Sequence, residues 1–390
     1  MAVRRLEFDS FDDNPHHEVF YFLCRDSESG KVYVQYDHYD PRGNCHSDHI
    51  EIAEFLSRKN DNVSAAKLLA LIGTLVPDAN KARKFWTLRR PALNTNPEME
   101  SAMEYGICMF LTDYSMQAAD LAVAVEERGF DALFVPDHTH IPVSRASQFR
   151  LGGDLPPDYS HNLDMFVALS AAAAVTKRIW LGTGVCLIIE RDPIITAKEV
   201  ASLDHISGGR VDFGIGGGWN REEMENHGAP WKRRWKVARE HIEAMQAIRT
   251  QDEARYAGEF VNFDVIWSSP KPVQKPHPPI FVGGDAAGTF KRILRYGDGW
   301  IPMLAEKGAA FDAKTQRMAE LAALARKAGR LPFPVTTFGT PRDPDAIAGL
   351  AKAGVTRCIF GLNAARKDAV LPRLDKLADL IARANERICA

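Results

Sequence analysis

The sequence lacks the paired cysteines, the long apolar runs and the excess of one charge that would define several classes of protein. Its six cysteines include no Cys-x-x-Cys pair, which argues against a disulfide framework or a thiolate zinc site. The apolar run 167–175 is far too short to cross a membrane, and no apolar signal segment follows the amino terminus. With 49 basic and 51 acidic residues, no overall field favours nucleic acid. We therefore expect a cytoplasmic protein that binds neither membranes nor nucleic acid.

The first part of the chain is expected to form a small α+β module. Two β-rich runs, 18–24 and 31–36, flank the turn-forming residues 26–30, which predicts a hairpin. Apolar residues then recur with helical spacing from Ile50 to Leu71. The stretch 88–99 contains two prolines and two asparagines and predicts a linker. We therefore expect a module over 1–90, a linker over 91–103 and a second domain over 104–390.

The module also gathers residues that are able to bind a metal. They are His16, His17, His38, Cys45, His46 and His49. Zinc would use such ligands, but these spacings fit no standard zinc site. We expect histidines in surface loops and no metal, with zinc coordination as the alternative.

After the linker, short apolar runs alternate with helical patterns, as is typical of parallel βαβ units. The expected strands are 105–111, 132–136, 179–188, 211–216, 279–283, 300–303, 335–339 and 357–360. Eight strands in roughly 290 residues favour a closed (β/α)8 TIM barrel over an open doubly wound sheet. After the fourth strand we expect a short helix near Glu222, a long helix from Trp231 to Arg249 and a hairpin over 256–263.

The second expected strand ends in an ionisable pair, Asp137 and His138. Barrel enzymes keep their catalytic groups at the carboxyl ends of their strands, so we predict that these two residues are catalytic. The structural alternative is that Asp137 caps the loop and His138 bonds backbone. The spacing His138-x-His140 also resembles a metal pair, but the other strand ends supply no ligands.

Glycine-rich segments follow the next three strands. Gly182 and Gly184 end the third, Gly214-x-Gly216-x-Gly218-Trp219 spans the fourth, and Gly283-Gly284 follows the fifth. Such residues let a flat ring or a phosphate approach the backbone, although they serve tight packing equally well. The fifth segment has a further alternative, a helix cap by Asp285. Pro193 suits a first helical turn, with Asp192 as its cap.

Taken together, these segments resemble the bacterial luciferase-like flavin monooxygenases, and especially their branch that uses the deazaflavin F-420. The resemblance is strong from Glu104 to about Met303 and loose beyond. Its motifs are Arg191-Asp192-Pro193, Ala197-Lys198, Leu203-Asp204, Ser207-Gly208-Gly209-Arg210, Gly214-x-Gly216-x-Gly218-Trp219, Pro276-His277-Pro278-Pro279, Gly283-Gly284 and Gly297-Asp298-Gly299-Trp300.

The resemblance implies where the cofactor and substrate lie. The cofactor site would comprise Gly184, Val185, Gly216, Gly218, Trp219, Gly283 and Gly284. The ring would lie against a bulge containing a cis peptide between Gly184 and Val185, and the phosphate on the amides of Gly283 and Gly284. Asp137 and His138 match a pair in deazaflavin-dependent sugar-phosphate dehydrogenases, where the histidine handles a substrate proton. Those enzymes carry a glutamate where this chain has Trp219, which disfavours sugar phosphates.

We therefore expect a luciferase-like oxidoreductase or monooxygenase that acts on a small organic substrate with reduced FMN or F-420, and with oxygen if the cofactor is FMN. Phe110, Trp219 and Trp300 would line the mouth. A flavin reductase is a candidate partner, and the resemblance is compatible with a homo-oligomer. The alternative is a catalytically quiet barrel that serves as a partner or regulatory subunit. The basic cluster 232–239 is expected to be a solvated helix face, or else to contact the polyglutamate tail of F-420.

Overall fold

The computed structural model describes residues 3–14, 17–26, 32–39, 45–51, 103–149, 152–304 and 309–389. The chain divides into two compact units. One comprises Met1–Pro97 with Arg326–Leu331, and the other Glu98–Ala325 with Pro332–Ala390.

The amino-terminal unit contains a four-stranded antiparallel sheet in the order β1-β2-β3-β4. Its strands are β1 (Val3–Asn14), β2 (His17–Asp26), β3 (Val32–Tyr39) and β4 (Cys45–Glu51). The expected hairpin is confirmed, because β2 pairs with β3 with Tyr21 opposite Tyr36. The helical prediction is wrong at Ile50, which lies in β4 opposite the buried Val34, so the sheet ladder overrides the apolar spacing. The rest of that prediction and the linker lie outside the described residues.

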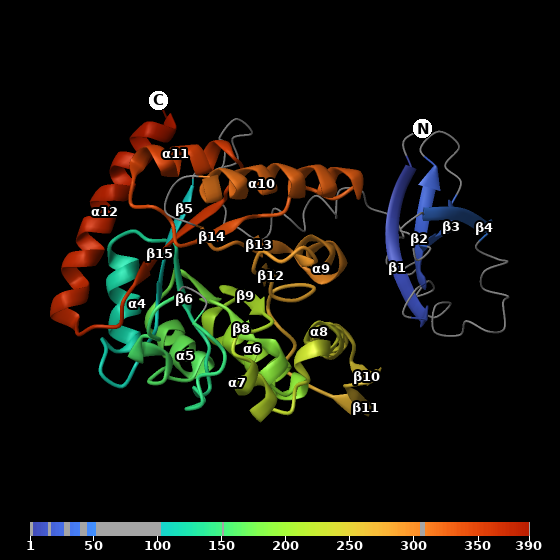
Figure 1. Ribbon diagram of the computed structural model, residues 1–390, viewed down its shortest axis with the longest axis horizontal. Helices are drawn as coiled ribbons and strands as arrows, with labels where there is room; N and C mark the ends of the chain where they lie inside the picture. Colours follow the sequence, from blue (N-terminus) through green and yellow to red (C-terminus); the bar gives the residue numbers. More distant parts are fainter. Residues whose placement is uncertain are drawn as a thin grey trace. The chain divides into compact units, whose positions relative to one another are not determined.

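The larger unit is built on eight parallel strands, as the sequence predicts (Figure 1). They comprise β5 (Glu104–Met109), β6 (Ala132–Val135), β7 (Trp180–Thr183) with β8 (Cys186–Leu187), β9 (Val211–Gly216), β12 (Ile280–Gly283), β13 (Gly299–Ile301), β14 (Thr336–Phe338) and β15 (Arg357–Leu362). They pair in chain order, and β15 returns to pair with β5. Parallel bridges from Trp300 to Val335 and from Met303 to Phe338 join β13 to β14. The TIM barrel of luciferase-like type is therefore confirmed.

The third expected strand is not continuous. It breaks into β7 and β8 at a cis peptide between Gly184 and Val185, where the resemblance places one. Before the break Leu181 pairs with Val211 of β9, and after it Cys186 pairs with Ile215 further along the same strand. The two residues at the break therefore stand at the carboxyl end of the barrel, between the ends of β7 and β9.

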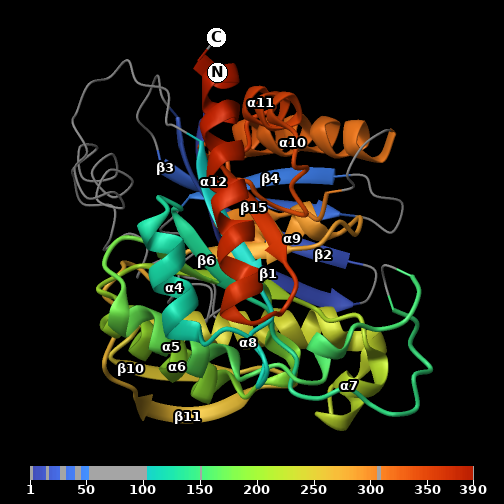
Figure 2. The same ribbon diagram turned by 90° about the vertical axis from the view of Figure 1, so that its left-hand side faces the viewer.

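Helices cover the outside of the barrel, and Figure 2 shows α12 running along it beside α4. The connecting helices are α4 (Ala118–Glu127), α5 (Met165–Val175), α6 (Pro193–Ser207), α9 (Thr289–Tyr296), α10 (Ala309–Lys327), α11 (Pro344–Lys352) and α12 (Lys367–Cys389). The predicted start of α6 is confirmed: Asp192 accepts from the amides of Ile194 and Ile195, and Pro193 follows it. No helix in the described ranges is long and apolar enough to span a membrane.

The excursion after β9 also has its expected form. It contains α7 (Arg221–Asn226), the short helix η3 (Trp231–Arg233), α8 (Arg234–Thr250) and the hairpin β10 (Glu253–Ala257) with β11 (Asn262–Trp267). In the hairpin, Tyr256 lies opposite Phe263. This insertion extends the wall at the carboxyl ends of the strands, which is where barrel enzymes bind their substrates.

Candidate functional site

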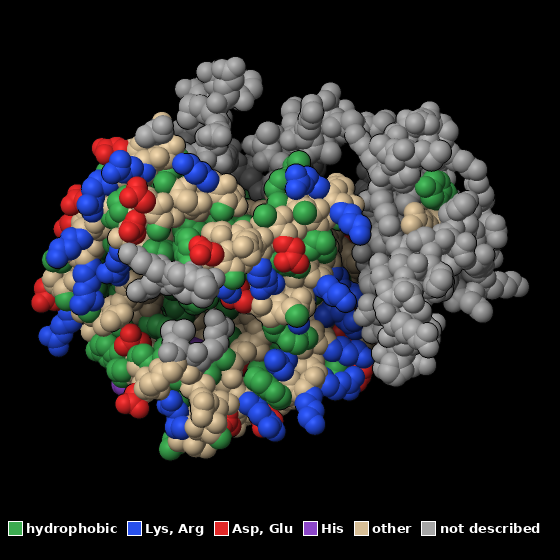
Figure 3. Space-filling view, turned by 45° about the horizontal axis from the view of Figure 1, so that its top comes forward, with side chains coloured by type: hydrophobic (Ala, Val, Ile, Leu, Met, Phe, Trp, Pro, Cys, Tyr) green, Lys and Arg blue, Asp and Glu red, His purple; other side chains and the backbone are tan. Residues whose placement is uncertain are grey.

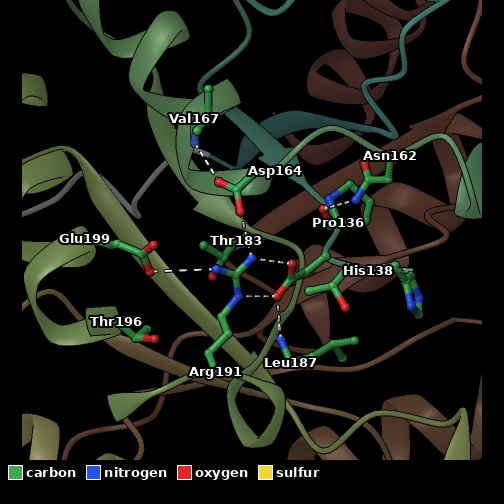
Figure 4. A network of polar contacts seen from close by, with 12 residues as sticks. Pro136, His138, Asn162, Asp164, Val167, Thr183, Leu187, Arg191, Thr196 and Glu199 are labelled. Atoms are coloured by element: carbon green, nitrogen blue, oxygen red, sulfur yellow. Dashed lines mark hydrogen bonds and ion pairs between the residues drawn. The ribbon is translucent and has the colours of Figure 1, made fainter. Parts of the chain in front are cut away.

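The second strand ends in a buried ion pair. Asp137, which follows β6, is 4% exposed. Its carboxylate accepts hydrogen bonds from Arg191 Nε at 2.9 Å and Arg191 Nη2 at 2.7 Å, and from the Leu187 amide at 3.0 Å. Arg191 also donates to Asp164, the N-cap of α5, at 3.1 Å, and it lies 3.7 Å from Glu199 of α6 (Figure 4). One guanidinium therefore joins the end of β6 to the starts of α5 and α6.

His138 is held by a different acid. Its Nδ1 lies 2.8 Å from Oε2 of Glu223, a residue of α7 that is 0% exposed. The other oxygen of Glu223 accepts from the Thr139 amide at 3.2 Å. Because a carboxylate only accepts, Nδ1 carries the proton and Nε2 is left as the nitrogen that can take or give one. In Figure 4 the imidazole points away from the Arg191 network.

Aromatic rings surround this imidazole. Its centroid lies 5.1 Å from that of Tyr159, 6.1 Å from that of Trp219 and 6.3 Å from that of Phe110. Phe149 extends the group by contacting both Tyr159 and Trp219. Such walls exclude water and pack well against an uncharged substrate.

A second buried acid lies near this pair. Glu190, the last residue of the short helix η2 (Ile188–Glu190), is 6% exposed, and neither of its carboxyl oxygens has a hydrogen-bond partner in the described structure. Burial, with the nearby Glu223 and Asp137 carboxylates, raises the pKa of Glu190 to about 9. The site therefore contains one carboxyl group that keeps its proton at neutral pH.

The residues expected to hold the cofactor fall into two groups. A Cβ atom built on Gly216 would lie 2.6 Å from Val185 Cγ2, and one on Gly283 would lie 3.2 Å from Val185 Cγ1. Val185 therefore lies against both glycines, and Gly184 adjoins it through the cis bond. Gly218, with φ of +65°, lies beside Glu190 instead, and Trp219 is among the rings around His138. The structure thus places the first group at the bulge and the second near the proton site.

The segment after β12 differs from the expected helix cap. Helix α9 begins at Thr289 after Gly288 and has no side-chain cap, so the alternative role of Asp285 is wrong. Asp285 instead pairs with Lys314 at 2.5 Å, because α10 brings that ammonium group to it. Gly284 has φ of +96°, and a Cβ there would meet no atom within 4 Å. The Gly284 N–H donates to the Ile301 carbonyl oxygen at 3.0 Å, so the amide expected to hold a phosphate is engaged in the sheet, and the turn is open only beside the Gly284 Cα.

Trp300 supports this turn from below instead of lining the mouth. It is 0% exposed, and its Nε1 donates to the carbonyl oxygen of Gly284 at 2.9 Å. Its ring packs against Phe290 of α9. Of the three aromatic residues expected at the mouth, Phe110 and Trp219 contact His138 and Trp300 does not.

Two arginines beside the glycine turns have no acidic partner among the described residues. The Arg292 guanidinium lies 3.5 Å from the centroid of Trp235, whose ring packs against Gly217. Its Nη1 is buried without a hydrogen-bond partner, and burial and the nearby Arg234 lower its pKa. Arg234 donates only to the Trp231 carbonyl. Two neighbouring guanidinium groups without a carboxylate form a site suited to an oxyanion.

Two other members of the basic cluster are ion-paired, as expected for a solvated face: Arg233 and Lys236 both pair with Glu259. Arg239 is half-buried, and its Nε has no hydrogen-bond partner in the described structure. Figure 3 shows positive and negative side chains interspersed over the face that it presents. Arg234 therefore differs from Arg233 and Lys236, which have an acidic partner.

The alternative of a metal pair at His138 and His140 is not favoured by the geometry. His140 contacts Thr139 through Nδ1 and Asn226 through Nε2, whereas His138 is bound to Glu223. No group of three or more potential ligands occurs in the parts of the chain that the structure describes. The expectation that the amino-terminal histidine cluster lies in loops is wrong for its described members, because His17 is in β2, His38 in β3, and Cys45, His46 and His49 in β4, where the sheet ladder holds them. Their side chains lie outside the described parts.

The fold and this arrangement at the strand ends define a luciferase-like barrel enzyme. The family model of the luciferase-like monooxygenases matches residues 93–357. The chain belongs to this family.

Its relatives include characterised and uncharacterised proteins. The uncharacterized protein Rv0953c of Mycobacterium tuberculosis is 44% identical over 286 residues, which are 72% of this chain and 99% of the relative. An FMNH(2)-dependent dimethylsulfone monooxygenase of Pseudomonas putida is 35% identical over 109 residues, 27% of this chain and 30% of its own.

Solved structures of a monooxygenase and of an F420-dependent enzyme share the fold. The monooxygenase RslO1 of Streptomyces bottropensis superposes with a TM-score of 0.58 at 18% identity, covering 74% of this chain and 99% of its own. An F420-dependent secondary alcohol dehydrogenase superposes with a TM-score of 0.57 at 16% identity, covering 72% of this chain and 99% of its own. At these identities the likeness shows the fold alone.

Proposed function

We propose that the protein is an oxidoreductase that binds reduced FMN or the deazaflavin F-420 at the barrel mouth and acts on a small, uncharged organic molecule. The contact between His138 and Glu223 is the observation that carries this proposal. A buried carboxylate on Nδ1 leaves Nε2 as a proton acceptor or donor within a ring of aromatic side chains. This arrangement suits a redox reaction in which a substrate oxygen gains or loses a proton.

The residues at the bulge and turns fit such a cofactor. Gly216 and Gly283 let Val185 pack against the backbone, since a Cβ on them would lie 2.6 Å and 3.2 Å from its methyl carbons, and the space beside the Gly284 Cα is open to a ligand. On the helix that follows, Arg292 has a buried nitrogen without a hydrogen-bond partner in the described structure. We propose that the ring lies against Val185 and that Arg292 holds the anionic end. When bound, F-420 would exchange a hydride with the substrate, whereas reduced FMN would activate oxygen.

Between the two chemistries, the proton site favours hydride transfer. In the oxidation of an alcohol, Nε2 of His138 would take the hydroxyl proton, and oxidised F-420, when bound, would supply the acceptor for the hydride from the carbinol carbon. The product is a carbonyl compound, and protons and electrons balance. Asp137 positions this machinery by holding the end of β6 through Arg191. The imidazolium that forms is stabilised by Glu223.

Oxygen insertion with reduced FMN is the second candidate, and the aromatic walls around His138 favour it because they exclude water. A flavin reductase partner, homo-oligomer formation and a cytoplasmic location remain predictions. A catalytically quiet partner subunit would have no need of the buried His138 and Glu223 pair. Measuring the size and the bound cofactor of the protein alone separates an enzyme from such a subunit.

Cofactor titration and one matched pair of variants test the proposal. Purified protein is titrated with FMN, reduced FMN and F-420, and turnover is then followed with secondary alcohols and, separately, with oxygen. His138→Gln should lower kcat by about 100-fold or more and leave the cofactor bound. His140→Gln, two positions away and hydrogen-bonded to Asn226, serves as the control and should retain activity. Failure to bind either cofactor, or full activity of His138→Gln, would refute the proposal.

A second pair of variants tests the anion site. Arg292→Gln should weaken the binding of FMN but not of riboflavin, which lacks the phosphate. Arg295→Gln is the control, because Arg295 lies on the same helix and pairs with Glu243. Equal affinities of Arg292→Gln and the parent protein for FMN would remove Arg292 from the site.

A further inference from the structure

Glu190 is a buried acid that the proposed reaction leaves without a role. Both of its carboxyl oxygens are inaccessible and lack a hydrogen-bond partner in the described chain. By contrast, Asp137 accepts three hydrogen bonds and Glu223 is bound by His138 and the Thr139 amide. A buried, ionised carboxylate without donors is strongly unfavourable, so such a group keeps its proton instead.

The packing places this carboxyl group next to the proton site. A Cβ built on Gly218 would lie 3.3 Å from both Glu190 Oε1 and Met224 Cε, and 4.0 Å from Leu187 Cδ2. Gly218 directly precedes Trp219, which contacts His138, and Met224 directly follows Glu223. The apolar side chains of Met224 and Leu187 therefore shield Glu190. The residues next to Gly218 and Met224 in the sequence are Trp219, which contacts His138, and Glu223, which binds it.

The surrounding charges act in the same direction. The titratable groups that act on Glu190 are Asp137, Cys186, Arg191 and Glu223, and His241 binds the carbonyl oxygen of Ile188 in the same short helix. Arg191 is engaged with Asp137 and Asp164, so its charge is already balanced. Burial lowers the pKa of His241 and raises that of Cys186, which keeps both neutral. Glu223 is thus the uncompensated charge, and it repels a second anion.

Of the two acids, Glu223 is the one that is ionised. Its oxygens accept hydrogen bonds from Nδ1–H of His138 and from the Thr139 amide, and both donors stabilise a carboxylate. Glu190 receives no donor. We propose that Glu190 is a positioning residue of the proton site: it stays protonated beside Glu223, so that the two acids carry one proton and one charge, which sets how strongly His138 holds its own proton.

This inference rests on the proposed role of His138 but is tested without cofactor. When Glu190 ionises at alkaline pH, a second negative charge appears near the His138 and Glu223 pair and favours the imidazolium form. The imidazole resonances of His138 should therefore respond twice to pH, once to its own titration and once to that of Glu190. A Glu190 that is already ionised at neutral pH, or that has no electrostatic coupling to His138, would produce only one response.

The experiment follows the ring nitrogens of His138 by NMR in apoprotein labelled at histidine, with His138→Gln used for assignment. We expect the parent protein to show a second inflection near pH 9 and Glu190→Gln to lose it while keeping the first. Glu222→Gln is the control, because Glu222 neighbours Glu223 in the sequence but binds Ser147 at the surface; it should keep both inflections. Since no cofactor is present, failure of cofactor binding leaves this test unaffected.

A direct measurement covers the case in which Glu190→Gln does not fold. The carboxyl carbon of Glu190 in the parent protein, labelled at glutamate, should titrate far above the ordinary range of a glutamate. An ordinary acidic titration of that carbon, a single inflection for His138 in the parent protein, or a second inflection that persists in Glu190→Gln would each overturn the proposal.

Discussion

Replacing Asp137 by asparagine removes one charge from the buried pair at the end of β6 and changes little in shape. The carboxylate accepts three hydrogen bonds, two from Arg191 and one from the Leu187 amide. Asparagine offers a single oxygen, so its amide group must face at least one of these donors. Arg191 is then left with Asp164, which is 43% exposed, and with the more distant Glu199.

The size of the effect follows from these contacts. Removing one partner of a buried pair costs about 3–5 kcal/mol, and the remaining contacts of Arg191 offset part of this. We therefore expect Asp137→Asn to lower the free energy of unfolding by about 3 kcal/mol. Urea unfolding followed by tryptophan fluorescence measures the change. Asp113→Asn is the control: Asp113 is 67% exposed and pairs only with His161, so about 0–1 kcal/mol is expected.

A double-mutant cycle identifies the partner. Asp137→Asn and Arg191→Gln should be strongly non-additive, with a coupling energy of about 1–3 kcal/mol, because the second change removes what the first has already weakened. A loss below about 1 kcal/mol for Asp137→Asn, or additive effects, would refute the argument that this pair holds the mouth together.

Three further changes test other features. Because the pKa of Glu190 is raised from 4.5 to about 9, the folded state keeps a proton that the unfolded state has released, so stability falls as pH rises through this window. Glu190→Gln lacks this loss. The free energy of unfolding of Glu190→Gln, measured in urea and relative to that of the parent protein, should therefore increase by about 3 kcal/mol from pH 4.5 to 7; a difference that does not change with pH would contradict this. Gly284→Ala should lower the free energy of unfolding by about 1–2 kcal/mol, because the φ of Gly284 is +96°, whereas Gly349→Ala in α11 should raise it; the same sign for both would count against the strain. Arg249→Met should raise the Tm, because all three guanidinium nitrogens are buried without a partner and the contact with Phe213 compensates only in part; a lower Tm would contradict this.

The architecture can be predicted from the sequence because the patterns that indicate it are local. The eight apolar runs, the cap at Asp192 and the hairpin at 256–263 each depend on a few neighbouring residues, and the structure has all of them. The break at Gly184 and Val185 was expected only from the family resemblance. Periodicity alone predicts one continuous strand there, because both halves are apolar.

Only half of the proton site can be predicted from the sequence, because its contacts join distant parts of the chain. His138 was expected at a strand end, but Glu223 is 85 positions away in an acidic run in which nothing marks one glutamate as buried. The N-cap at Asn220 sets the phase of α7, which turns Glu223 inward and Glu222 outward. Knowing that cap would have identified the buried acid.

The contacts of Glu190 and Arg191 also cannot be predicted from the sequence alone. They are adjacent in the sequence, yet Arg191 binds three acids and Glu190 binds no donor. The motif Arg191-Asp192-Pro193 marks Arg191 in the sequence, but nothing there predicts a contact for either residue. The two residues differ because Arg191 reaches the carboxylate of Asp137, whereas Glu190 lies near the carboxylate of Glu223, and both of those acids belong to other elements.

The Arg191 guanidinium also bears on how this barrel can diversify. It binds Asp137 and Asp164, and these residues stand at the two ends of the connection between β6 and α5. That connection supplies Phe149 and Tyr159 to the walls around His138. Its ends are thus fastened to one point outside it, so the residues between His138 and Asp164 can be exchanged, lengthened or shortened while the anchors and His138 stay in place. We expect that a change of substrate requires changes in this segment only, with the barrel and its proton chemistry kept intact.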